Sequence, residues 1–156
     1  MRLRLIALTL VPGLVMAPFI FTSRAEAALG ERATPVSAAR KASAASQTTT
    51  AARSGYTVQE IKTGATNVRE YITPSGIVFA VAWNGVSHPD LTPILGSYTS
   101  GYRQALGQAK RQRGQRRSRV SSDKVVVERW GHMRNLQGKA YVPSLIPNGV
   151  NIDEIK

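Results

Sequence analysis

The chain of 156 residues contains no cysteine. This absence excludes disulfide bonds and a disulfide-linked partner. It also excludes thiol catalysis, zinc–thiolate sites and lipid attachment through an N-terminal cysteine. The fold must therefore be held together by packing and hydrogen bonds.

Groups suited to acid–base chemistry are scarce as well. The sequence has two histidines and nine Asp and Glu residues against 21 Lys and Arg residues, which gives a formal net charge of +12. Such an excess of positive charge favours anionic partners over chemistry built on carboxylates. At 42% hydrophobic residues, the chain can still bury the core of one domain.

The two histidines, His88 and His132, form no recognisable catalytic or metal motif, because neither has His-x-x-x-His or Glu-x-x-His spacing. His132 and Met133 would supply only half of a copper site. A triad with His132 can be drawn on paper, without a nucleophile elbow, from Ser118, Ser121 or Ser122 together with Asp123. We predict no catalytic residue, cofactor or metal ligand, and keep a small periplasmic hydrolase or metal-binding protein using His132 as the alternative.

Residues 1–27 are typical of a secretory signal peptide. Arg2 and Arg4 precede an apolar run over residues 5–21, and Ala25-Glu26-Ala27 has the small-x-small pattern that signal peptidase requires. Cleavage between Ala27 and Ala28 would release a soluble protein into the periplasm or the medium. The alternative is an uncleaved membrane anchor, although a run of 17 residues interrupted by two prolines is short for a membrane span.

Residues 28–54 differ in composition from everything that follows. Nine of these 27 residues are alanine and none is aromatic. Such a segment buries too little apolar surface to offset its ordering entropy, so we predict a flexible tether. In the alternative interpretation, Ala28-Leu29-Gly30 docks on the domain as a plug or a short edge strand.

Residues 55–156 are predicted to form a single α+β domain with one antiparallel sheet of about five strands, in the order β-β-β-α-β-β. Thr73-Pro74-Ser75-Gly76 has the turn chemistry of a tight hairpin between the second and third strands. The expected strands are rich in β-branched and aromatic residues. They cover residues 56–62, 68–73, 77–83, 124–130 and 139–142.

One amphipathic helix is expected to pack on this sheet. Asp90 is a suitable N-cap for a helix that starts at Leu91. Beyond it, large apolar residues recur every three or four positions. Alternation in the third strand predicts that its bulky face meets this helix. That face consists of Ile77, Phe79, Val81 and Trp83.

The stretch that follows the helix is the most strongly charged part of the chain. It holds six cations in ten residues: Lys110, Arg111, Arg113, Arg116, Arg117 and Arg119. Like charges at this density keep a loop extended and exposed. We predict that it binds polyanions by charge, without nucleic acid as a partner, because no interleaved aromatic residue is present to stack on bases. A plain solvated loop is the alternative.

Several short words of the sequence resemble, in the same order, the DUF2844 family. They are ALG (28–30), YTV (56–58), VREY (68–71), GIVFAVAW (76–83), PDL (89–91), LGSY (95–98), GHMR (131–134), GKAYVP (138–143) and PNGV (147–150). Trp130 departs from the pattern, since a small residue is expected there. The resemblance implies a single-domain, exported bacterial protein of unknown function and carries over no catalytic residue.

These observations predict a small, non-catalytic binding or accessory protein of the bacterial cell envelope. The partners expected for it are anionic phospholipid head groups, lipopolysaccharide or acidic polysaccharide, or another envelope protein. The sequence does not define which of these it binds or whether it oligomerises.

We expect the mature protein to begin at Ala28, because the cleavage pattern ends at Ala27. The intact mass of the exported fraction measures this directly. Recovery of a form that retains residues 1–27 in the membrane fraction would contradict cleavage and favour the anchor.

Overall fold

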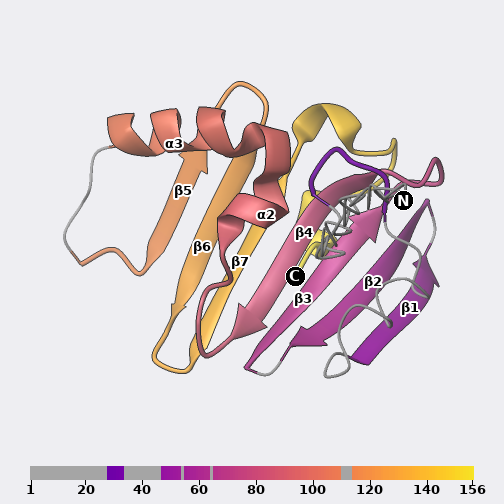
Figure 1. Cartoon of the computed structure of the whole chain (residues 1–156), viewed down its shortest axis with the longest axis horizontal. Coiled ribbons are helices and arrows are strands. Elements are labelled where there is room, and N and C mark those ends of the chain that lie inside the picture. Colours follow the sequence, from indigo (N-terminus) through magenta and orange to yellow (C-terminus); the bar gives the residue numbers. More distant parts are fainter. Residues whose placement is uncertain (1–27, 34–46, 54, 64, 110–113) are drawn as a thin grey trace, which may run out of the picture.

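The computed structural model describes residues 28–33, 47–53, 55–63, 65–109 and 114–156, so the predicted signal peptide lies outside the described residues. Within this part of the chain, seven antiparallel strands form one sheet in the order β1-β2-β3-β4-β7-β6-β5 (Figure 1). The strands are β1 (Gln47–Arg53), β2 (Tyr56–Thr63), β3 (Thr66–Ile72), β4 (Val78–Gly85), β5 (Arg117–Ser121), β6 (Val126–His132) and β7 (Asn135–Tyr141).

The prediction of about five strands is therefore wrong, although the protein is still α+β and mostly β. The two edge strands were missed. β1 consists largely of threonine and alanine, and its register with β2 runs from Gln47↔Lys62 to Arg53↔Tyr56. β5 lies in the basic stretch that was expected to be a loop. Both strands are poor in large apolar residues, so pairing with a neighbouring strand decides their conformation.

Two helices lie across one face of this sheet, which we call the helix face (Figure 1). α2 (Leu91–Leu95) begins where predicted, and the Asp90 side chain accepts a hydrogen bond from the Thr92 amide at 2.9 Å. The expected continuous helix is interrupted by a short 3-10 turn, η1 (Gly96–Tyr98), before α3 (Thr99–Gln108). The break falls at Gly96, whose φ of 51° is readily adopted only by glycine.

The segment 28–33 docks between the helices and β4. Leu29 is fully buried, and its amide donates to the Ile94 carbonyl at 2.9 Å. The Gly30 amide donates to the Val78 carbonyl at 2.8 Å. The alternative interpretation of Ala28-Leu29-Gly30 as a docked plug is thus correct. The predicted tether is wrong for residues 28–33 and for β1, while residues 34–46 and 54 lie outside the described chain.

Glycines allow this docking on both sides of the contact. A Cβ atom at Gly96 would lie 2.6 Å from the Cβ atom of Ala28. A Cβ atom at Gly30 would lie 2.8 Å from the Tyr98 hydroxyl oxygen. Both distances are shorter than non-bonded atoms normally approach a Cβ atom. The close approach of residues 28–30 to η1 therefore depends on the two glycines.

β4 is buried on both of its faces from Val78 to Trp83. A β-bulge shifts its register with β3, so that Tyr71 pairs with Ala80 and Ile72 with Val78. The shift turns Val78 toward the helix face and Phe79 away from it. The prediction that Phe79 faces the helix, which was based on simple alternation, is therefore wrong.

The opposite face, which we call the tail face, is covered by the C-terminal residues. These include η2 (Pro143–Leu145) and η3 (Ile152–Glu154). Ile155 is 1% exposed and packs with Tyr71 and Phe79. The Tyr71 hydroxyl donates to the backbone carbonyl of Lys156 at 3.1 Å and accepts from its amide at 3.2 Å. The C-terminus is therefore an integral part of the core.

Trp83 anchors the helix-face core, as predicted, and is 2% exposed. Its ring fills the space above Gly138, where a Cβ atom would come within 2.3 Å of the ring.

We expect Trp83→Ala to lower the free energy of unfolding by about 3–5 kcal/mol, since it removes a large buried side chain. Urea denaturation measures the loss. Val86→Ala, at a 52% exposed position nearby, is the control and should change stability little. A Trp83→Ala variant as stable as the parent would contradict this packing.

Candidate functional site

The C-terminal residues cover only part of the tail face. They pack over the cross-strand row that contains Val126 and Tyr141. The next two rows along the strands are polar. In one, Arg119 pairs with Glu128, which pairs with Lys139; in the other row, the residues are Arg117, Trp130 and Gln137. Directly paired residues project from the same face of a sheet, so these side chains form one surface.

Glu128 organises the two arginines on this surface. Its carboxylate is 5% exposed, and its two oxygens lie 3.3 Å from Arg117 Nη2 and 3.5 Å from Arg119 Nη1. The arginine side chains themselves are 72% and 63% exposed. A buried carboxylate thus holds two guanidinium groups side by side, while most of their N–H donors still face solvent.

Lys139 adds a third cation beside this pair. It is 7% exposed, and its Nζ donates to the Ile152 carbonyl at 3.0 Å. A cavity of about 450 Å³ lies between these cations and the C-terminal residues, with Tyr141 and Asp153 in its lining. Burial raises the pKa of the Tyr141 hydroxyl above its ordinary value, and the group is a protonated hydrogen-bond donor at neutral pH.

The two polar rows continue on the same face of the sheet, across β4 and β3 to β2. Lys62 and Arg69 lie in them, and Arg69 Nε is 4.0 Å from the Glu60 carboxylate. We call this surface the basic face. It comprises Lys62, Arg69, Arg117, Arg119, Lys139, Glu60 and Glu128. With Asp153 in the cavity lining, five cations stand against three carboxylates, and this excess of positive charge makes the surface suited to binding an anionic group.

The basic cluster predicted from the sequence is thus divided. Lys110, Arg111 and Arg113 lie outside the described residues. Arg116 is exposed immediately before β5, and Arg117 and Arg119 lie within that strand. Polyanion binding by all six residues stays a prediction.

Sequence reasoning missed the partners of these arginines. Glu128, Lys139 and Tyr141 are assembled by the pairing of β5, β6 and β7. The available signal was one acidic residue, Glu128, directly after three valines in a strongly β sequence. A carboxylate in such a strand needs a cationic partner on a neighbouring strand.

His132 occupies a position that supports neither of its alternative roles. It is exposed at the β6–β7 turn, opposite Asn135, whereas Tyr141 pairs with Val126 at the other end. His132 and Tyr141 therefore lie at opposite ends of the β6–β7 pair. Asp123 lies beyond the far end of β6, a strand about 20 Å long. His132 and Asp123 are therefore too far apart to form the Ser-His-Asp triad considered from the sequence. Among the described residues, no three His, Cys, Asp or Glu side chains gather as metal ligands would.

His88 is instead part of the packing around Trp83. The indole Nε1 donates to His88 Nδ1 at 3.0 Å. Partial burial lowers the pKa of the His88 imidazole, and the nearby Arg129 lowers it further. The neutral ring that accepts this hydrogen bond is therefore the form that the fold favours.

The architecture defines a small α+β protein with one antiparallel sheet, two covered faces and an exposed basic surface. The chain belongs to the DUF2844 family: the model described as "Protein of unknown function (DUF2844)" matches residues 25–155. No curated protein and no solved structure matches it. None of the helices in the described part of the chain has the length and apolar character to cross a membrane.

The His88 contact makes stability depend on pH. A histidine whose pKa is lower in the folded state contributes fully above its unfolded pKa, about 6.5, and this contribution is lost as the pH falls through the folded value. We expect the free energy of unfolding to fall between pH 7.5 and pH 5. His88→Gln keeps an acceptor for Trp83 but does not titrate, so it should reduce this dependence. His132→Gln is the control, and equal pH dependence in all three proteins would contradict the assignment.

Proposed function

We propose that the protein is an exported, non-catalytic binding protein of the bacterial cell envelope that holds anionic groups on its basic face. The observation that carries the proposal is the buried Glu128 carboxylate, which fixes Arg117 and Arg119 beside Lys139 at a cavity. Guanidinium groups oriented in this way suit phosphate and carboxylate groups, because each presents parallel N–H donors to two oxygens.

The sequence supports export, and the structure shows the surroundings of the residues after the expected cleavage position. The sequence of residues 1–27 has the pattern of a cleaved signal peptide. The residues that follow the expected cleavage are packed, with Ala28 6% exposed and Leu29 fully buried. Removal of residues 1–27 would leave this docked segment at the N-terminus of the mature protein, where it closes the helix-face core.

The expected partners in this compartment are phospholipid head groups, lipopolysaccharide phosphates or acidic polysaccharides, with another envelope protein as the alternative. Arg116 beside β5 adds positive charge next to the basic face. Binding of this kind is strongly weakened by salt, since the Debye length is only about 8 Å at 0.15 M salt. Nucleic acid is not expected, because the protein would not meet it in the envelope.

The test is binding to vesicles of phosphatidylcholine with anionic phosphatidylglycerol at low salt. Each cation near such a surface contributes about 1 kcal/mol, so the double variant Arg117→Gln/Arg119→Gln should bind about 30-fold more weakly. It should also lose about 1–3 kcal/mol of stability, because Glu128 is left buried without its partners.

Adding Glu128→Gln separates the two effects. The triple variant should recover part of this stability, since the buried carboxylate that lost its arginine partners is gone, and it should still bind weakly. Arg32→Gln/Arg103→Gln removes two positive charges elsewhere on the surface and is the matched control for the double variant Arg117→Gln/Arg119→Gln. Vesicle binding by the triple variant equal to that of the parent protein would overturn the proposal.

A further inference from the structure

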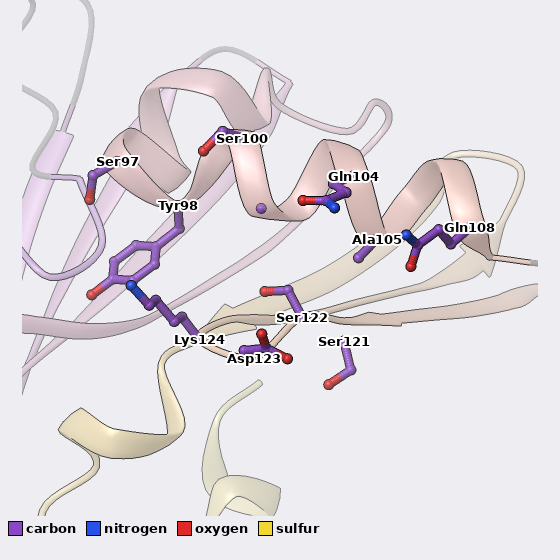
Figure 2. Close-up of a pocket in the computed structure, with 11 residues that line it drawn as sticks. Ser97, Tyr98, Ser100, Gln104, Ala105, Gln108, Ser121, Ser122, Asp123 and Lys124 are labelled. Carbon is purple, nitrogen blue, oxygen red and sulfur yellow. The ribbon is translucent and has the colours of Figure 1, made fainter.

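A second cavity lies on the helix face of the sheet, away from the basic face. It has a volume of about 370 Å³ and is formed between α3 and the turn that joins β5 to β6. Figure 2 shows Ser100, Gln104 and Gln108 on the α3 side and Ser121, Ser122 and Asp123 on the opposite side. Its size is within the range of small-ligand sites.

The lining is hydrophilic and carries no net charge. Four serine hydroxyls and two carboxamides line the cavity, and Asp123 is balanced by Lys124. Ser122 is engaged by the turn, where its hydroxyl donates to the Val125 carbonyl at 3.1 Å. The side chains of Gln104, Gln108 and Asp123 are exposed and form no side-chain hydrogen bond with another described residue, so their donors and acceptors are available to a ligand.

The side of α3 that faces this cavity differs from the side that packs on the sheet. Tyr102 and Leu106 contribute to the core, whereas Gln104 and Gln108, four residues apart, point to the cavity side. Gly101, one turn before Gln104 and Ala105, also lines the cavity and leaves the helix backbone open to it. A Cβ atom there would meet only the Ser122 hydroxyl oxygen, at an ordinary 3.8 Å, so packing does not require glycine at this position.

We propose that this cavity binds an uncharged saccharide unit. Carboxamides and carboxylates are planar groups that can each engage two neighbouring sugar hydroxyls, and serine hydroxyls can donate or accept as the ring requires. Tyr98 lines one end of the cavity and offers aromatic surface to the C–H face of a sugar ring. The balanced charge of the lining gives no preference for an anion.

The site is independent of the basic face, because no residue lines both cavities. It therefore gives the protein two separate ligand surfaces. An anionic group would bind at Arg117 and Arg119, and a neutral sugar would bind beneath α3. Variants of one surface should leave the other intact.

The test uses the ¹⁵N-labelled protein and three neutral oligosaccharides: maltohexaose, cellohexaose and chitohexaose. At least one should shift the amide resonances of Gly101, Gln104 and Asp123 in a saturable titration. Gly101→Leu fills the cavity from the helix and should weaken binding at least tenfold. Gly107→Leu lies on the same helix with nothing within 4 Å of its Cβ position, and it should stay within twofold of the parent protein.

Two further variants keep the test decisive. Gln104→Ala/Gln108→Ala changes exposed side chains only and should also weaken binding, even if Gly101→Leu is poorly folded. Arg117→Gln/Arg119→Gln should leave saccharide binding unchanged, whatever it does to vesicle binding. No saturable shift with any of the three sugars, or equal binding by the parent protein and the cavity variants, would overturn the inference.

Discussion

The burial of β4 on both faces is the constraint on which the rest of the structure depends. Six consecutive residues, from Val78 to Trp83, are shielded from solvent, so each face of the sheet needs its own cover. The helices and Leu29 supply one cover, and the residues around Ile155 supply the other. Elements from the two ends of the described chain therefore complete a core that has no disulfide to hold it.

The C-terminal residues cover only part of the tail face and leave the rest of it open. The C-terminal residues pack over the apolar row of Tyr71, Phe79 and Tyr141. The adjoining rows remain open, and they carry Glu128 with its two arginines. A buried carboxylate is costly without partners, so the arrangement both stabilises the strand pairing and directs cationic donors outward. Structure and proposed binding depend on the same ion pairs.

Local sequence signals predicted local features well. The turn around Pro74 is present, since the Gly76 amide donates to the Thr73 carbonyl at 2.9 Å. The N-cap Asp90 and the burial of Trp83 likewise follow from short-range pattern. Strand β1 could not be predicted, because none of its residues is large and apolar, and its pairing with β2 decides its conformation. The side of the sheet to which Phe79 points depends on a β-bulge, and the alternation of residue types in the sequence does not reveal this bulge. The proposed anion site combines side chains from three strands, so its geometry emerges only from their register.

The central claim is that the open rows of the tail face are a ligand surface. An NMR titration of the ¹⁵N-labelled protein with inorganic polyphosphate at low salt tests it most directly. The account predicts saturable amide shifts concentrated on β5, β6 and β7 around Arg117, Arg119, Glu128 and Lys139, which disappear at high salt. Shifts confined to the helix face, or no shifts at low salt, would contradict it.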